Sequence, residues 1–490
     1  MTLSRPRTQP YIVVLFFFLT GLPGTAAWAD VIPVTGVPVS ELADFDQEML
    51  DLMELHDLEG GVLAVSVNGC VVYQRGFGWR ERSPTSIQLP ENTPMRLASV
   101  EKPLTAATIR HLANLGYFSL GDYVFDLDQP FGGILQFPLW QDLGDDRLNN
   151  ITVNHLLHHE GGWDAEFIGF DPQFKAIEIA NAMEGVSSPP GRENTVRYML
   201  SQPLQFPPGI PHPPCDTDAG GACLREPTPC VCNSYSNFGY MVLGLIVEHF
   251  VGPPHVDAIR QLTLTPEMWV PATELFPGRT FSADQSPREP RYRCPGCRDC
   301  VNVFNPGGSG VSCPYGGWDH ESMTGHGNLV ASAAPLLTFL DIYVVGGPDI
   351  GMLQSGTSGN WAHTGALTGT STIASQRHDG VNIVVLFNQR MSNDDPDLAA
   401  TMATAIYDLI GDPPTVTWPT LCVDGSWVDF DASESGYGGY NDPFHTMAIA
   451  LASTAPGVKL RLMPGTSNWT GTLSTRMRID APFGLATIGQ

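Results

Sequence analysis

Short runs of hydrophobic and β-branched residues occur near both ends of the main part of the chain. Residues 61–67 and 70–77 form one such pair, and Asn68-Gly69 between them strongly favours a two-residue hairpin turn. Three similar runs come much later, at residues 361–367, 370–377 and 381–388. The pattern therefore predicts antiparallel strands that are contributed by two distant parts of the chain.

Apolar residues at helical spacing flank and separate these runs. Residues 41–58 and 399–410 each show a helical pattern, and the chain from Ser99 to about Val330 is mostly helical and loop-like. A helix and hairpin at one end, with a hairpin and helix at the other, indicate a single sheet whose helical lobe is an insertion. The expected fold class is α/β in the α+β sense, an antiparallel sheet flanked by helices.

The composition changes after Pro413. Glycine, serine, threonine and aspartate become more frequent, and short strand-like runs alternate with turns. We therefore divide the chain into residues 1–29, 30–412 and 413–490, the last being a β-rich C-terminal extension. The extension is similar to the first coils of right-handed β-helix proteins, although a small structural appendage would fit as well. One or two coils cannot bury a core alone, so it should dock on the main domain or on another molecule, such as a cell wall or surface.

Composition and charge narrow the class of protein. Hydrophobic residues make up 42% and charged residues 16% of the 490 residues, which is typical of a globular protein. The 25 basic and 51 acidic side chains give a net charge of −26, which offers little to a nucleic acid or to an anionic membrane. We expect a small-molecule or peptide substrate and no nucleic-acid partner.

The first 29 residues have the pattern of a secretory signal. Arg5 and Arg7 precede an apolar run at residues 12–22, and Ala27-Trp28-Ala29 supplies the small residues of a cleavage site. The run is too short to span a bilayer comfortably. The sequence therefore predicts a secreted or periplasmic protein with no membrane anchor after cleavage.

Eight of the ten cysteines lie in two clusters. They are Cys215, Cys223, Cys230 and Cys232 in the first, and Cys294, Cys297, Cys300 and Cys313 in the second. Export favours disulfides, although the two-residue spacings of the second cluster also suit a zinc ion held by four thiolates. Three pairings are open within each cluster. We favour disulfides and expect no metal or other cofactor.

The segment Ser99-Val100-Glu101-Lys102 begins a helical, largely apolar stretch. Residues three apart lie on one helix face, so the hydroxyl and the amine can meet. A serine needs a base to become a strong nucleophile, and a buried lysine with a lowered pKa can share that task. Ser99 is the candidate nucleophile and Lys102 its proton-handling partner, although the start of a surface helix would show the same pattern.

A second motif, Tyr235-Ser236-Asn237, precedes a long apolar segment. A phenol held near Lys102 can act as general base to Ser99 and later as acid to the leaving group. Asn237 can hold Lys102 and a substrate carbonyl. The structural alternative is a helix N-cap at Ser236 or Asn237.

A third motif, His363-Thr364-Gly365-Ala366, lies on a predicted strand. Gly365 would let a substrate lie against the strand edge, while His363 and Thr364 would supply hydrogen bonds near the reacting centre. The backbone N–H groups of Ala366 and Ser99 are the candidate oxyanion hole. A turn at the end of a strand is the alternative interpretation.

Together, in this order and at these separations, the three motifs resemble those of penicillin-binding-protein and class C β-lactamase-type serine hydrolases. The similarity covers about residues 41–410 and includes the stretches 151–162 and 235–248. It implies a β-lactamase/transpeptidase-like fold, with the site between the sheet and the helical lobe, and an acyl-enzyme mechanism without metal.

The chain departs from this family at two places that concern the substrate. His363 stands where many β-lactamases have a lysine, and so provides less permanent charge for a substrate carboxylate. Residues 210–234 are an insertion beside the expected site. We expect hydrolysis of an ester, amide or lactam carbonyl, with esters favoured. The alternatives are a D-alanyl-D-alanine carboxypeptidase or β-lactamase, and a non-catalytic binding module, against which the intact Ser99, Lys102 and Tyr235 argue.

Overall fold

The computed structural model describes residues 31–489 with several gaps. The residues not described within this range are 83–86, 129, 131, 166–169, 211–233, 265–269, 271, 355–358, 391–396, 420–421, 424, 434–435, 437, 439–442, 455–458, 474–476 and 482–484. The predicted signal segment 1–29 and the first cysteine cluster therefore lie outside the described residues. Residues 33–490 belong to one compact unit.

The main sheet joins the two ends of the main segment, residues 30–412, as the sequence pattern predicts. Its strands are β1 (Val34–Thr35), β2 (Gly60–Val67), β3 (Cys70–Glu81), β4 (Ile87–Gln88), β8 (Trp361–Leu367), β9 (Thr370–Gln376) and β10 (Val381–Phe387). They are antiparallel and follow the order β1-β3-β2-β10-β9-β8, with β4 paired to β3. The two predicted hairpins meet where Val65 pairs with Ile383. This order leaves β8 at one edge of the sheet.

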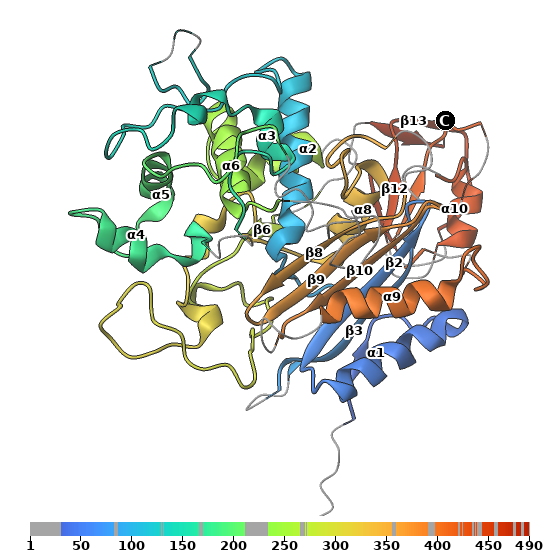
Figure 1. Cartoon of the computed structure of the whole chain (residues 1–490). Helices are drawn as coiled ribbons and strands as arrows, with labels where there is room; N and C mark the ends of the chain where they lie inside the picture. The colour runs from blue at the N-terminus through green and yellow to red at the C-terminus, as the bar shows by residue number, and fades with distance from the viewer. Residues whose placement is uncertain are drawn as a thin grey trace, which may run out of the picture. The chain divides into compact units, whose positions relative to one another are not determined.

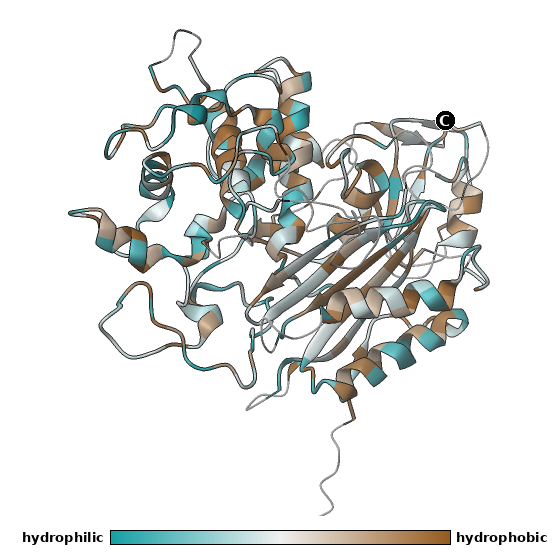
Figure 2. Cartoon of the chain, viewed as in Figure 1, coloured by the Kyte–Doolittle hydropathy of each residue, from teal (hydrophilic) through white to brown (hydrophobic). Residues whose placement is uncertain are grey.

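Helices cover both faces of this sheet (Figure 1). On one face α8 (Ala333–Ile342) packs Leu336 and Leu340 against Val62 and Val384 in a common core. Side chains alternate between faces along a strand, so the neighbouring positions face the other way. There α1 (Ala43–Leu55) and α9 (Leu398–Ile410) lie side by side. Figure 2 shows hydrophobic colouring along the central strands and mixed colouring on α1, as expected for half-buried helices.

The helical lobe is inserted between β5 and β7. It contains α2 (Glu101–Asn114), α3 (Val153–Leu157), α4 (Ala176–Ala182), α5 (Gly191–Leu200), α6 (Asn237–Val251) and α7 (His255–Ala258). Its short turns are η2 (Ala98–Val100), η3 (Asp146–Asn150), η4 (Pro172–Phe174) and the π-helical η5 (Ile259–Thr263). α2 packs on α6 through a buried core that includes Ile109, Leu112 and Leu243. The N-terminal ends of both helices carry predicted site residues.

A small antiparallel sheet ties the start of the lobe to its end. β5 (Met95–Arg96) pairs with β7 (Leu329–Ala331), which also pairs with β6 (Leu275–Pro277). The backbone N–H of Leu97 donates to the carbonyl of Leu329 at 2.8 Å. The residues that lead into the Ser99 motif are therefore fixed to the chain that leaves the lobe. The remaining short helices are η1 (Ser40–Leu42), η6 (Ser282–Asp284), η7 (Cys313–Tyr315) and η8 (Glu321–Met323).

The C-terminal extension forms short parallel strands. β11 (Ser426–Val428), β12 (Lys459–Leu462) and β14 (Arg478–Asp480) make one parallel sheet, β13 (Gly465–Ser467) and β15 (Ala486–Ile488) make another, and α10 (Met447–Ser453) packs beside β11. A small core of its own includes Val428, Phe444 and Leu460. Parallel pairing is what successive β-helix coils would show, and the predicted boundary near residue 412 stays a prediction.

A disulfide attaches the start of this extension to the main sheet. Cys70, the first residue of β3, is bonded to Cys422 across 352 residues of sequence. The backbone N–H of Val423 also donates to the carbonyl of Val71 at 2.7 Å. The extension therefore docks on the main segment at this point, as the limited core of one or two coils leads us to expect.

Candidate active site

The Ser99 motif sits at the turn between β5 and α2. Ala98 has a positive φ of 49°, a left-handed conformation that L residues rarely adopt, and it redirects the chain into the helix. Ser99 follows in the single turn η2 and is half-buried, whereas Lys102 on α2 is completely buried. The Lys102 ammonium donates to Ser99 Oγ at 2.8 Å. The helical spacing of three residues thus brings the predicted nucleophile and its partner into direct contact.

Burial shapes the chemistry of Lys102. Loss of solvation lowers its pKa to about 7, although the nearby charges of Asp171 and Glu101 act in the opposite direction. A lysine with this pKa exchanges its proton near neutral pH, which an exposed lysine does not do. The amine can therefore both accept the proton of a serine hydroxyl and return it.

Three oxygen atoms surround the Lys102 amine. Besides Ser99 Oγ, it donates to Asn237 Oδ1 at 2.7 Å and to the backbone carbonyl of His326 at 3.3 Å. An ammonium has three N–H donors, so these acceptors account for all of them. The amine is held in one position, and Asn237 takes the predicted role of holding it.

Tyr235 and Asn237 flank the N-cap of α6. Ser236 Oγ accepts the backbone N–H of Gly239 at 3.0 Å, so the N-cap expected as a structural alternative is present alongside the motif. The Tyr235 ring lies face-on to Lys102, with the Lys102 amine 4.6 Å from its centroid. A cation at this distance stabilises negative charge on the phenol, which is what a phenolate base needs.

A half-buried histidine packs against Tyr235. The ring of His159 lies 4.7 Å from that of Tyr235 and 4.9 Å from that of Tyr240, and its Nδ1 accepts the backbone N–H of Ser236 at 3.1 Å. Burial, and then the charge of Lys102, hold the pKa of His159 well below 6.5. His159 is therefore a neutral ring that packs against the ring of Tyr235. The sequence did not reveal this contact.

The other histidines of that segment point elsewhere. His155 forms a capping box with Thr152 at the start of α3, while the His158 ring contacts the carbonyl of Pro348 at 3.1 Å. His155 and His158 therefore make separate structural contacts away from Ser99. No group of three or more histidine, cysteine or acidic side chains is arranged to hold a metal ion within the described ranges.

Asp171 joins the site although no sequence motif contains it. Its Oδ2 accepts a hydrogen bond from Asn237 Nδ2 at 2.5 Å, while its Oδ1 accepts the backbone N–H of Gln173 at 3.2 Å as the N-cap of η4. Burial raises the pKa of Asp171, while the Asn237 hydrogen bond and Lys102 oppose that rise. A lone Asp-Pro pair 66 residues before Asn237 is too weak a signal to find from sequence.

The third motif lies along the β8 edge beside Ser99. A Cβ atom on Gly365 would lie 2.2 Å from the carbonyl of Leu97, 2.3 Å from Thr372 Oγ1 and 3.2 Å from the backbone nitrogen of Ser99. Only glycine allows this close approach of β8 to Ser99, while the predicted role of Gly365 in substrate binding stays a prediction. Thr364 and Ala366 alternate with Gly365 and are exposed. The oxyanion hole of the Ser99 and Ala366 N–H groups stays a prediction.

His363 carries no charge at neutral pH. It is half-buried on β8, and its Nδ1 lies 3.0 Å from the carbonyl of Thr364. Burial, with the charge of Lys102 as a second cause, lowers the pKa of His363 to about 4. The third motif therefore supplies a neutral hydrogen-bonding group and no cation, in line with the weaker charge expected from the sequence.

The second cysteine cluster is paired as disulfides. Cys294 is bonded to Cys297, and Cys300 is bonded to Cys313. The second bond packs in a small core with Ala98, next to the nucleophile, and with Leu367 at the end of β8. This disulfide therefore braces both chain segments that meet at Ser99.

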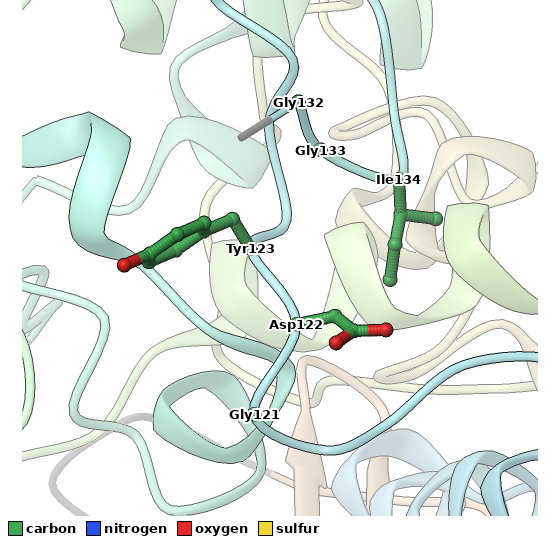
Figure 3. Close-up of a pocket in the computed structure, with 6 residues that line it drawn as sticks. All are labelled: Gly121, Asp122, Tyr123, Gly132, Gly133 and Ile134. Atoms are coloured by element: carbon green, nitrogen blue, oxygen red, sulfur yellow. The ribbon is translucent and has the colours of Figure 1, made fainter. Parts of the chain in front are cut away.

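A separate cavity lies in the helical lobe (Figure 3). It has a volume of about 510 Å³ and is lined by Gly121, Asp122, Tyr123, Gly132, Gly133 and Ile134. Asp122 accepts the backbone N–H of Ser119 at 2.9 Å, so its carboxylate stabilises the turn at residues 119–122. None of the predicted site residues lines this cavity.

A family model described as Beta-lactamase matches residues 45–358, well over half of the chain. The chain belongs to the β-lactamase family. The family predicted from the three motifs, and the β-lactamase/transpeptidase-like fold, are thereby confirmed.

One curated relative and two solved structures match the chain at low identity. A putative D-alanyl-D-alanine carboxypeptidase of Salmonella typhimurium is 24% identical over 239 residues, which cover 44% of this chain and 46% of that relative. The chain thus matches less than half of the relative's length. A penicillin-binding protein homologue from Pyrococcus abyssi covers 74% of this chain and 77% of its own, at 18% identity and a TM-score of 0.45. EstCE1, a hydrolase with promiscuous acyltransferase activity, covers 75% and 98%, at 17% identity and a TM-score of 0.49.

Proposed function

We propose that this β-lactamase-family protein is an exported esterase in which Ser99 forms an acyl-enzyme with an uncharged carboxylic ester. The observation that carries the proposal is the Lys102 amine, which is buried, has a pKa near neutrality and donates to Ser99 Oγ at 2.8 Å. A binding module that had lost catalysis would not need a lysine in this costly, desolvated position.

The acylation step uses the groups around Ser99. Ser99 Oγ attacks the ester carbonyl, and its proton passes to the Lys102 and Tyr235 pair. The carbonyl π electrons move onto oxygen, where the N–H groups of Ser99 and Ala366 are the proposed donors. When the carbon–oxygen bond to the alcohol breaks, the pair returns the proton to the leaving alkoxide. Water then attacks the acyl-enzyme, with the same pair taking its proton and returning it to Ser99.

Neutral His363 favours an uncharged substrate. An enzyme that grips a carboxylate beside the scissile bond gains from a fixed cation there, and His363 has a pKa of only about 4. The Lys102 ammonium also carries a positive charge at the site, but its three N–H groups already donate to acceptors of the protein. The carboxylate of a D-alanyl-D-alanine peptide or of a penicillin would therefore meet a neutral ring at this position.

Two observations bear on export. Disulfides such as Cys70–Cys422 and Cys300–Cys313 persist in oxidising compartments, which fits the signal pattern in the first 29 residues. No helix in the described part of the chain is both long and apolar enough to cross a bilayer. We therefore propose a secreted or periplasmic protein, whose C-terminal extension is available for contact with a cell wall or surface.

The D-alanyl-D-alanine carboxypeptidase alternative comes from the motif resemblance, and the name of the Salmonella relative supports it. A substrate panel separates the alternatives. We would measure kcat/KM for a p-nitrophenyl butyrate ester, a diacetyl-Lys-D-alanyl-D-alanine peptide and a chromogenic cephalosporin, with Ser99→Ala as the control. We expect the ester to be hydrolysed fastest and all turnover to vanish in the variant. Faster turnover of the peptide or cephalosporin would favour the alternative.

A further inference from the structure

Glu101 is a completely buried carboxylate that lies between Ser99 and Lys102 in the sequence. Its Oε1 accepts the backbone N–H of Gly325 at 2.6 Å, and its Oε2 accepts the backbone N–H of Leu329 at 2.7 Å. The two oxygens therefore bind both ends of one segment, residues 325–329. In the site described above, this segment takes part only through the carbonyl of His326, which accepts a hydrogen bond from Lys102.

Segment 325–329 is the third support of the Lys102 amine. The carbonyl of His326 accepts a hydrogen bond from Lys102 Nζ at 3.3 Å. The other side of the segment is pressed against α6, because a Cβ atom on Gly325 would lie 2.3 Å from the carbonyl of Tyr240 and one on Gly244 would lie 3.0 Å from that of Thr324. The segment is thus clamped between α6 and Glu101.

We propose that Glu101 is a positioning residue for proton transfer at Ser99. Its carboxylate fixes segment 325–329 so that the His326 carbonyl holds the Lys102 amine on Ser99 Oγ. The inference deepens the proposed function and rests on it.

Among the described residues that face Glu101, Lys102 is the one that can carry a positive charge at neutral pH. His255 Nε2 on α7 lies 3.8 Å from Glu101 Oε1, but burial and then Arg192 lower the pKa of His255 to about 3, so the ring is neutral. From segment 325–329, burial and Lys102 hold the pKa of His326 well below 6.5, and Tyr240 on α6 has a raised pKa because of burial. Both therefore stay neutral at pH 7.

Charge at Glu101 affects Lys102 directly. Burial raises the pKa of Glu101 to about 7, although the backbone N–H donors and Lys102 limit that rise. The negative charge of Glu101 opposes the fall in the pKa of Lys102 that burial causes. Removing the carboxylate charge should therefore lower the pKa of Lys102, since a buried ammonium loses a favourable neighbour.

Two variants both disturb the geometry of segment 325–329, but only one removes the charge. Glu101→Gln removes the charge and has a single oxygen that can accept one of the two N–H groups, while Glu101→Asp keeps the charge and both acceptors but is one methylene too short to reach both N–H groups. The exposed Glu178→Gln on α4 is the control. We would measure, across the pH range, the rate constant for covalent labelling of Ser99 by a fluorophosphonate, together with the thermal unfolding temperature of each variant.

We expect Glu101→Gln to slow labelling by about tenfold or more and to move the midpoint of the pH dependence to lower pH. Glu101→Asp should also slow labelling while leaving the midpoint near that of the wild type, and Glu178→Gln should change neither. A purely structural role would lower the unfolding temperature without moving a midpoint. Wild-type rates and midpoints in folded Glu101 variants would overturn the inference alone. Absence of labelling in the wild type would overturn the proposed function and the inference with it.

Discussion

Asp171 accepts a hydrogen bond from the side-chain amide of Asn237 at 2.5 Å, and this contact decides which end of the amide faces Lys102. An ionised carboxylate only accepts, so the NH₂ group of Asn237 must point to Asp171 and its oxygen to the Lys102 amine, 2.7 Å away. Hydrogen bonds therefore link Asp171 through Asn237 to the Lys102 amine, which donates to Ser99 Oγ.

Removing the charge of Asp171 should change the titration of Lys102. Asp171 is the strongest of the charges that oppose the burial-lowered pKa of Lys102, so Asp171→Asn should lower that pKa further. We expect the midpoint of kcat/KM against pH to move to lower pH, and the rate on the high-pH plateau to fall about tenfold because the amine becomes a weaker base for the Ser99 proton. The exposed Glu178→Gln serves as control, and an unmoved midpoint at wild-type rate would show that Asp171 does not act on Lys102.

Lys102→Arg tests whether the amine exchanges a proton. Arginine keeps the positive charge but stays protonated, so it cannot take the proton of Ser99. We expect kcat/KM for ester hydrolysis to fall by about a thousandfold or more in this variant and in Lys102→Met. Circular dichroism would check that both variants are folded. Activity within tenfold of wild type in Lys102→Arg would mean that Lys102 contributes only its charge.

Gly365→Ala tests the close approach of β8 to the nucleophile. The added methyl group would overlap the carbonyl of Leu97 and Thr372 Oγ1, both closer than 2.5 Å, and would push the strand away from Ser99. We expect kcat to fall by about a hundredfold because the strand and nucleophile no longer align. Gly307→Ala is the matched control, since a Cβ atom there has nothing within 4 Å. Equal activity of both variants would remove Gly365 from the site.

His363→Lys tests the proposed preference for uncharged substrates. A lysine at this position would add a cation where His363, with a pKa of about 4, is neutral. The ratio of kcat/KM for a carboxylate-bearing ester to that for its methyl ester should rise about tenfold. The same measurement on Thr364→Val reports the effect of disturbing the strand without adding charge. An unchanged ratio in His363→Lys would mean that this residue does not face the substrate.

The Cys70–Cys422 disulfide should matter for stability rather than for chemistry. It closes a loop of 352 residues, and removing a disulfide typically costs about 2–5 kcal/mol because the unfolded chain gains freedom. We expect the double variant Cys70→Ser, Cys422→Ser to unfold at a lower temperature while its rate of Ser99 labelling at low temperature stays near wild type. Loss of labelling in the folded double variant would instead link the extension to the active site.

The sequence predicted those features that short-range patterns encode. Asn68-Gly69 marks the β2–β3 hairpin, which is where the structure has it, and the three-residue spacing brings Lys102 onto Ser99. Gly365 of the third motif lies against Leu97 and the backbone of Ser99, while its substrate-binding role stays a prediction. Local turn and helix geometry determine these positions, so a single sequence suffices to predict them.

The remaining parts of the site depend on long-range packing. Asp171 reaches Asn237 from 66 residues away, and Glu101 binds backbone groups 224 and 228 residues further on. Neither carboxylate belongs to a motif, and their partners include backbone N–H groups, which every residue type except proline offers. The parallel pairing of β11, β12 and β14 likewise arises from stacking between distant turns of the chain. Such contacts become visible only in the folded structure.

Ser99 as the nucleophile is the central claim, and intact-mass analysis after exposure to a fluorophosphonate tests it most directly. The account predicts a single covalent adduct on the wild-type protein that maps to Ser99, is absent from Ser99→Ala and is strongly reduced in Lys102→Arg. No adduct on wild-type protein shown to be folded, or an adduct that persists in Ser99→Ala, would contradict it.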